Sequence, residues 1–167
     1  MSNEIVNRVA NSQLKTINLE DFYPQGTRTS IDIKNWLFQE LILKETEFRE
    51  HLKNHNWEQY NNMYVALTCS CDAIIPSWAF MLITTYLSPF AKKIVVGNLT
   101  ALETSIYHEI IANFNIEEFI NKPIIIKGCA QKPIPETAYI QLIEKLQPIA
   151  KSIMFGEACS TVPLYKK

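Results

Sequence analysis

Residues that mark non-globular chains are scarce, with 4 glycines and 8 prolines among 167 residues. This composition excludes a collagen-like chain, and a hydrophobic content of 47% excludes a disordered or low-complexity one. The chain also lacks an excess of either charge, because 16 basic and 17 acidic residues leave a formal net charge of -1. Such a chain has no strong field to attract a nucleic-acid backbone or an anionic membrane. We therefore expect a globular protein that binds no nucleic acid.

Long apolar runs and a secretory signal are lacking as well. The longest apolar stretch, residues 73–87, is interrupted by a proline and by hydroxyl side chains, whereas a membrane span needs about 20 apolar residues. Residues 1–11 are polar and have no apolar segment of the kind that directs secretion. We therefore expect a protein without a membrane span that lies in the cytoplasm, where its thiols are reduced.

Several common functional motifs do not occur in the chain. There is no glycine-rich phosphate loop, no dinucleotide-binding G-x-G-x-x-G and no G-x-S-x-G elbow, so nucleotide binding and serine hydrolase chemistry have no motif behind them. No C-x-x-C is present, which excludes a zinc ribbon and a thioredoxin-type motif. The sequence therefore indicates where a site lies but does not name a reaction.

From residue 63 onward, short apolar runs alternate with longer amphipathic segments. The helices are expected to begin near Pro76, near Thr100 and near Pro135, and Thr100 with Glu103 has the spacing of a capping box. Strands that alternate with helices of this length indicate parallel pairing. The four expected strands are Met63 to Thr68, Lys93 to Val96, Pro123 to Lys127 and Ser152 to Phe155, which gives a βαβαβαβ core over residues 63–167.

Residues 1–60 have a less regular pattern. Leu14 to Leu19 and Thr29 to Ile33 resemble strands, whereas Trp36 to Leu43 and Thr46 to Asn54 resemble helices. No flexible linker follows, so we expect a single domain over residues 1–167, with residues 1–60 as an N-terminal α/β extension packed on the sheet. The predicted class is α/β, with one layered, mostly parallel sheet. No internal repeat is evident, and the tail after Gly156 is expected to be irregular.

The four cysteines each follow an expected strand. Cys69 and Cys71 come after the first core strand, Cys129 after the third and Cys159 a few residues after the fourth. In one parallel sheet all four would lie at the carboxyl edge, where open α/β proteins place their ligand sites.

This placement predicts a cysteine-based metal site. Neighbouring strands lie about 4.8 Å apart, and tetrahedral zinc with bonds of about 2.3 Å needs sulfur atoms less than about 4 Å apart. Four thiolates also suit an iron–sulfur cluster. We therefore expect zinc or an iron–sulfur cluster bound by Cys69, Cys71, Cys129 and Cys159.

Other interpretations of these residues stay open. The cysteines could be small buried core residues, or one of them could be a nucleophile or part of a redox pair. Asp72 could be the fourth ligand in place of Cys71, although we favour a role as the cap of the following helix. His51 and His55 are spaced to share a helix face, but their charged neighbours favour a solvated surface.

The whole chain resembles the bacterial domain-of-unknown-function family 2480. The resemblance is carried by five stretches: Asp21 to Pro24, Asp32 to Leu37, Ala66 to Ser70 with Ile75-Pro76, Lys127 to Cys129, and Lys151 to Glu157 leading to Cys159 to Pro163. These stretches contain Cys69, Cys129 and Cys159, so the three form the core of the expected site, with Cys71 or an open position as the fourth.

The resemblance implies no established activity. Genes of the family accompany iron–sulfur assembly genes, which implies a protein partner in that process. The leading hypothesis is thus a cytoplasmic protein with a cysteine metal site that handles metal or iron–sulfur clusters. The alternatives are a small thiol-dependent enzyme, or a non-catalytic interaction module whose surface includes Phe22, Tyr23 and Trp36.

Overall fold

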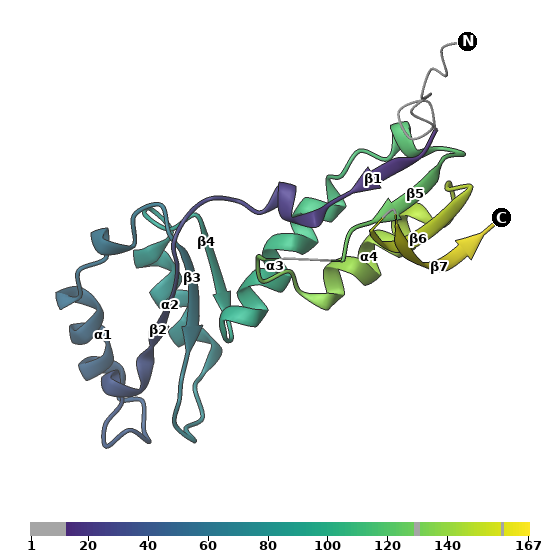
Figure 1. Ribbon diagram of the computed structural model, residues 1–167. Coiled ribbons are helices and arrows are strands. Elements are labelled where there is room, and N and C mark those ends of the chain that lie inside the picture. Colours follow the sequence, from purple (N-terminus) through teal and green to yellow (C-terminus); the bar gives the residue numbers. More distant parts are fainter. Residues whose placement is uncertain (1–12, 129–130, 158) are drawn as a thin grey trace, which may run out of the picture. The chain divides into compact units, whose positions relative to one another are not determined.

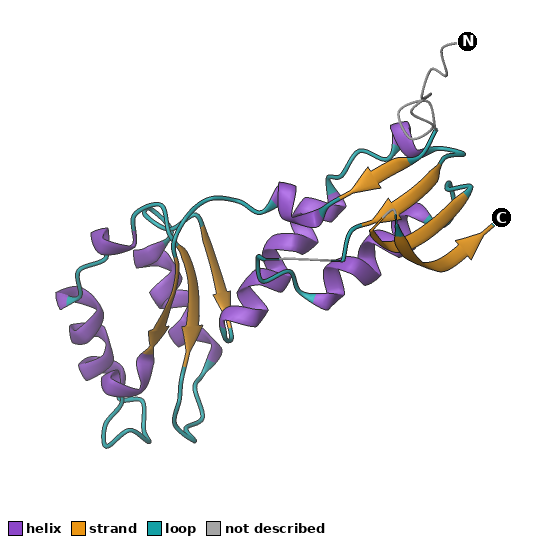
Figure 2. Ribbon diagram, in the orientation of Figure 1, coloured by secondary structure: helices purple, strands orange, loops and turns teal. Residues whose placement is uncertain are grey.

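The computed structural model describes residues 13–128, 131–157 and 159–167. Helices and strands alternate along most of this length, which confirms the α/β class (Figures 1 and 2). The strands and α-helices are β1 (Lys15–Ile17), β2 (Arg28–Asp32), α1 (Glu45–Asn54), β3 (Tyr64–Thr68), α2 (Ser77–Leu87), β4 (Lys93–Val96), α3 (Leu99–Ala112), β5 (Pro123–Ile126), α4 (Glu136–Leu146), β6 (Ser152–Glu157) and β7 (Ser160–Lys166). Four short 3-10 turns are η1 (Leu19–Phe22), η2 (Ile33–Trp36), η3 (Glu58–Tyr60) and η4 (Glu117–Phe119).

The strands form two sheets and not the single sheet that the sequence predicted. One sheet has the order β2-β3-β4 and is entirely parallel, whereas the other has the order β1-β5-β6-β7 with only β7 antiparallel. The prediction of one sheet was wrong because β5 pairs with β1 and β6 instead of adding to β4. Consecutive β–α–β segments need not share a sheet when an earlier strand of the chain is available as a partner.

The chain divides into two compact units around these sheets. Unit 1 contains Met1–Tyr23 and Tyr107–Lys167, and unit 2 contains Pro24–Ile106. Each has its own apolar core. The prediction that residues 1–167 form a single domain stays a prediction, because compact units can unfold together as one domain.

The core of each unit lies between helices and sheet. In unit 2 the fully buried Phe48 and Leu52 of α1 pack with Ile83 of α2 and with Val65 and Leu67 of β3. The near-continuous apolar sequence of β3 fits a strand that is covered on both faces. In unit 1 the corresponding core is formed by Tyr107, Ile111, Leu142, Leu146, Ile124, Ile126 and Ile153.

The two units have the same order of elements. Unit 2 contains β2, η2, α1, η3, β3, α2 and β4, and unit 1 contains β1, η1, the end of α3, η4, β5, α4 and β6, followed by β7. From α1 onward the matching residues lie at one constant spacing along the chain. They include Pro76 and Pro135, Ala79 and Ala138, Leu87 and Leu146, Pro89 and Pro148, and Gly97 and Gly156.

Matching backbone hydrogen bonds support this equivalence. The N–H of Asn62 donates to the carbonyl of Phe90 at 2.9 Å, and that of Asn121 donates to the carbonyl of Ile149 at 2.8 Å. Both asparagines have positive φ angles, of 59° and 57°. The structure therefore contains an internal repeat that the sequence analysis did not find, with unit 2 inserted in the chain between η1 and the end of α3.

Three local predictions also failed. Residues 36–43 do not form a helix, because Gln39 and Glu40 have positive φ angles of 51° and 56° in a tight turn that a Phe38–Ile42 bridge closes. The C-terminal tail is not irregular but forms β7. The Thr100–Glu103 capping box is replaced by Asn98, whose side chain accepts from the Ala101 N–H at 2.9 Å.

The helices are short relative to a bilayer. Within the described ranges, none combines the length and the apolar character that a membrane-spanning helix requires.

Candidate functional site

The turn after β3 brings two cysteines together. The Sγ atoms of Cys69 and Cys71 lie 3.2 Å apart, and both residues are half-buried. The Ala73 N–H donates to the Cys71 carbonyl at 3.0 Å, which tightens the turn after the pair. At this distance one thiol donates a hydrogen bond to the other, so the two sulfur atoms act as a pair.

Asp32 fixes this turn from the neighbouring strand. It lies opposite Thr68 in the parallel β2–β3 pair, and its Oδ1 accepts from the N–H groups of Ser70 and Lys34, each at 3.1 Å. Partial burial tends to raise the pKa of Asp32, but hydrogen bonds from the Ser70 side chain and from these N–H groups hold it below its usual value. The carboxylate is therefore charged at neutral pH and orders the loop that carries both cysteines.

The environment of the pair favours the protonated form of Cys71. The pKa of its thiol is raised, first by the hydrogen bond to Cys69, then by desolvation and by the negative charges of Cys69 and Glu40. Glu40 lies in the tight turn after η2, so the segment that follows β2 supplies this negative charge. Cys71 therefore keeps its proton to a higher pH than an isolated cysteine does.

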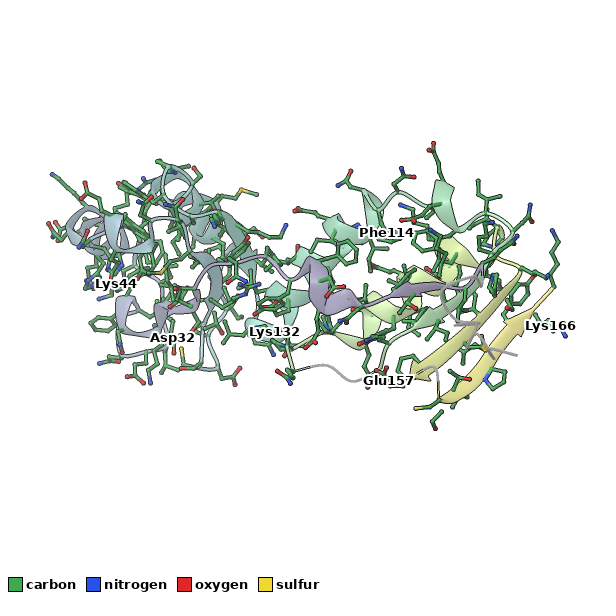
Figure 3. All side chains as sticks on the ribbon, turned by 45° about the horizontal axis from the view of Figure 1, so that its top comes forward. Asp32, Lys44, Phe114, Lys132, Glu157 and Lys166 are labelled. Atoms are coloured by element: carbon green, nitrogen blue, oxygen red, sulfur yellow. The ribbon has the colours of Figure 1, made fainter. Side chains whose placement is uncertain are left out.

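Cys69 and Cys71 do not share a sheet edge with Cys159, although the sequence predicted one edge for all four cysteines. Cys69 and Cys71 follow β3 in unit 2, whereas Cys159 is exposed in the turn between β6 and β7 of unit 1. Figure 3 labels Asp32 in unit 2 and Glu157, which is close to Cys159 in sequence, in unit 1. Cys129 lies outside the described residues. The prediction of one common edge was wrong because it assigned all four core strands to one sheet, whereas β3 and β6 lie in different sheets.

The remaining candidate ligands near the pair are few. Among the described residues, no group of three or more histidine, cysteine, aspartate or glutamate side chains is arranged to hold a metal ion. Asp72 is exposed and does not cap α2, because the N-cap residue is Pro76 and makes no side-chain cap hydrogen bond. The structure thus supplies two sulfur atoms at the candidate site in unit 2.

The two histidines of α1 and its C-cap have different surroundings. His51 is exposed, in agreement with a solvated face. His55 instead packs in an aromatic cluster with Trp36, Trp57 and Tyr60, and its Nε2 lies 2.9 Å from the Tyr60 hydroxyl. His55 is therefore part of the packing of unit 2.

The position of His55 predicts a pH-dependent stability. Burial lowers the pKa of His55 from its ordinary value of 6.5, so the folded state favours the neutral ring. The stability that the neutral His55 ring contributes is fully present above the pKa of this ring in the unfolded chain. It is lost as the pH falls through about 6.5 toward the lower folded-state pKa, because the unfolded chain then binds a proton that the folded chain does not.

We expect the urea midpoint to fall between about pH 7.5 and about pH 5.5 by more in the wild type than in His55→Phe. The repeat supports this substitution, since phenylalanine is the matching residue in unit 1 (Phe114). His51→Gln is the control and should keep the wild-type pH dependence. If His55→Phe keeps the pH dependence of the wild type, the neutral His55 ring is not its source.

Two acidic residues of the site were not predicted from the sequence: Asp32, which binds the Ser70 N–H between the two cysteines, and Glu40, whose charge acts on Cys71. Asp32 begins one of the stretches that carry the family resemblance, which was the available signal. Placing it beside Ser70 required knowledge that β2 pairs with β3. Glu40 approaches Cys71 through a turn that the sequence analysis had interpreted as a helix.

Comparison with protein families shows where the chain belongs. The model of the family described as "Protein of unknown function (DUF2480)" matches residues 3–167. The chain is therefore a member of this family over essentially its whole length, which confirms the resemblance. No curated protein and no solved structure matches it.

Proposed function

We propose that the protein binds a thiophilic metal ion through the thiolates of Cys69 and Cys71. The observation that carries the proposal is the 3.2 Å separation of their Sγ atoms. Tetrahedral zinc with bonds of about 2.3 Å holds two sulfur atoms just under about 4 Å apart. A small rotation of the two side chains reaches this geometry, and the fixed turn limits the entropy that binding costs.

Two thiolates leave coordination positions open for other ligands. Open positions are typical of sites that exchange a ligand or pass on a metal. The proposed role is therefore metal handling, with zinc or an iron–sulfur species as the cargo and an iron–sulfur assembly protein as the partner. The predicted cytoplasmic location would keep both thiols reduced.

The metal content of matched variants tests this proposal. Protein purified without air and without a metal-affinity tag is loaded with zinc, passed through a desalting column and analysed for zinc and protein. We expect about one zinc per chain in the wild type and a loss of most of it in Cys69→Ser and in Cys71→Ser, because one thiolate chelates far more weakly than two.

Cys159→Ser is the matched control, since Cys159 is an exposed cysteine of the other unit. It should bind zinc as the wild type does. Wild-type retention of zinc in both Cys69→Ser and Cys71→Ser would refute the proposal. Loss of zinc in Cys159→Ser would instead support the larger cysteine site expected from the sequence.

Thiol–disulfide exchange is a second candidate function, favoured by the hydrogen bond between the two thiols. In this reaction Cys69 and Cys71 form a disulfide and release two electrons and two protons, which reduce a substrate disulfide to two thiols. The raised pKa of Cys71 is compatible with its role as the thiol that attacks second. Metal-free protein that forms this disulfide with oxidised glutathione, while Cys159 stays reduced, would favour the redox function.

A further inference from the structure

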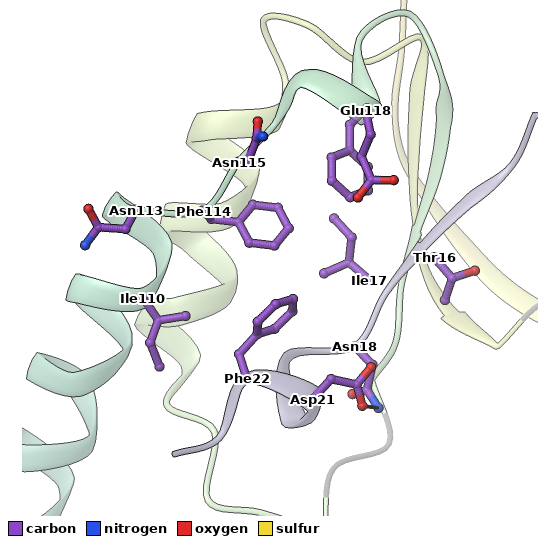
Figure 4. A pocket seen from close by; sticks show the side chains of 11 residues that line it. Thr16, Ile17, Asn18, Asp21, Phe22, Ile110, Asn113, Phe114, Asn115 and Glu118 are labelled. Atoms are coloured by element: carbon purple, nitrogen blue, oxygen red, sulfur yellow. Dashed lines mark hydrogen bonds between the residues drawn. The ribbon is translucent and has the colours of Figure 1, made fainter.

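Unit 1 contains a cavity that the cysteine site does not use. It has a volume of about 410 Å³ and is lined by residues of β1, η1, the end of α3 and η4 (Figure 4). Small-molecule sites are typically about 300–1,000 Å³. The cavity is therefore large enough for a compact organic ligand.

Hydrogen bonds at the ends of the elements position the walls of the cavity. The Asn18 side chain accepts from the Glu20 N–H at 3.2 Å, and the Asn115 side chain accepts from the Glu117 N–H at 2.9 Å. The Tyr107 hydroxyl donates to the Leu19 carbonyl at 2.9 Å and joins α3 to η1. These hydrogen bonds thus fix the backbone of the cavity walls.

The apolar part of the lining is aromatic. Phe22 of η1 and Phe114 after α3 both point into the cavity (Figure 4), and their rings contact each other edge to face with centroids 5.3 Å apart. Phe114 also stacks on Phe119, with centroids 5.6 Å apart. Phe22 is 40% exposed, which makes it accessible to a ligand. The faces of such rings carry partial negative charge and attract cations.

The polar part of the lining is acidic. Asp21 and Glu118 are its two charged residues, and none of the eleven described residues that line the cavity is a lysine, an arginine or a histidine. Glu118 pairs with Lys15 at 2.8 Å, and the two side chains are 62% and 39% exposed, so solvent weakens this pair. Asp21 accepts a long hydrogen bond of 3.3 Å from Asn18. Both carboxylates favour a positively charged ligand.

The repeat places larger rings in unit 2 at positions that match the cavity lining of unit 1. Trp36 matches Phe22, because the two are the last residues of η2 and η1. By the constant spacing of the repeat, the residues of unit 2 that match Phe114, Ile116 and Phe119 are His55, Trp57 and Tyr60. These four rings pack on one another, with centroid distances of 6.0 Å between Trp36 and Trp57 and 4.7 Å between His55 and Trp57. At the positions of the Trp36 and Trp57 indole rings of unit 2, unit 1 has the smaller side chains of Phe22 and Ile116.

We infer that this aromatic and acidic cavity of unit 1 is a binding site for a small organic ammonium ion. The cation contacts the faces of Phe22 and Phe114, and the carboxylates of Asp21 and Glu118 balance its charge. Asn113 and Asn115 also line the cavity, where their amides bind the backbone of Glu109 and Glu117.

Nuclear magnetic resonance titration of the isotope-labelled full chain tests the site. Choline chloride is the probe, and 3,3-dimethylbutan-1-ol, a neutral molecule of the same shape, is its matched control at equal ionic strength. We expect saturable shifts of the amide signals of the lining residues with choline and binding about tenfold weaker, or weaker still, with the neutral analogue.

Two variants place the binding in the cavity. Phe22→Trp introduces the ring that unit 2 carries at the matching position, so it should fill the cavity, keep the fold and abolish the shifts. Asp21→Asn should weaken choline binding several-fold, whereas Glu144→Gln, which removes an acid on α4 away from the cavity, should not.

Equal binding of the neutral analogue, or wild-type binding in folded Phe22→Trp, would overturn the inference, as would the absence of saturable shifts with choline. The cysteines take no part in this experiment. Its outcome is therefore independent of the proposed metal site.

Discussion

Glu103→Ala is expected to lower the free energy of unfolding by about 3–5 kcal/mol, because it leaves a buried guanidinium without its carboxylate. Glu103 of α3 accepts from the Nε of Arg28 at 2.7 Å, and the two side chains are only 7% and 11% exposed. Arg28 also donates to the carbonyls of Pro24 and Gly26, each at 2.7 Å, and lies over the ring of Tyr64. These contacts hold the guanidinium in place, so we expect it to stay buried when the carboxylate is removed.

Urea unfolding measures this loss. Glu50→Ala, which removes an exposed acid of α1, is the control and should change the free energy of unfolding by no more than about 0.5 kcal/mol. The double variant Arg28→Met with Glu103→Leu should recover much of the loss, because it removes both charges at once. A loss below about 1 kcal/mol in Glu103→Ala would show that solvent reaches the pair.

Gly156→Ala is expected to lower the free energy of unfolding by about 2–5 kcal/mol. Gly156 has a φ of 122°, a conformation that residues with a side chain rarely adopt. An added Cβ would also lie 2.5 Å from the backbone carbonyl oxygen of Ser160, in the strand that pairs with β6. Backbone strain and a steric overlap therefore act together.

The repeat provides a matched control in Gly97, whose φ is 137°. An added Cβ there would meet the methyl group of Ala101 at 2.9 Å and not a backbone atom. Gly97→Ala should share the backbone strain but lose less stability than Gly156→Ala, by about 1–3 kcal/mol. Equal losses in thermal or urea unfolding would contradict the steric part of this account.

Much of the secondary structure could be predicted from the sequence because apolar periodicity is a local property. The expected strand from Lys93 to Val96 has the bounds of β4, and the helices expected after Pro76 and Pro135 are α2 and α4. The pairing of strands could not be predicted from this local periodicity. Which strand lies beside β5 depends on β1, far away in the chain, and short apolar strands carry little information about their partners.

Because strand pairing could not be predicted, only part of the candidate site could be predicted from the sequence. The position of Cys69 and Cys71 after a strand was predicted, since it follows from the local pattern. Their expected combination with Cys129 and Cys159 assumed one sheet, and the structure has two. The repeat was hidden because its matching residues are mainly prolines, glycines and small or apolar core residues, which the surrounding sequence does not mark as related.

X-ray absorption spectroscopy of the zinc-loaded protein tests the central claim most directly. The Cys69–Cys71 pair should give two sulfur neighbours at about 2.3 Å from the zinc, with lighter atoms in the other positions. A first shell made only of nitrogen and oxygen atoms would contradict a thiolate site at the end of β3. A shell of four sulfur atoms would contradict the two-thiolate account, since unit 2 places only these two sulfur atoms together.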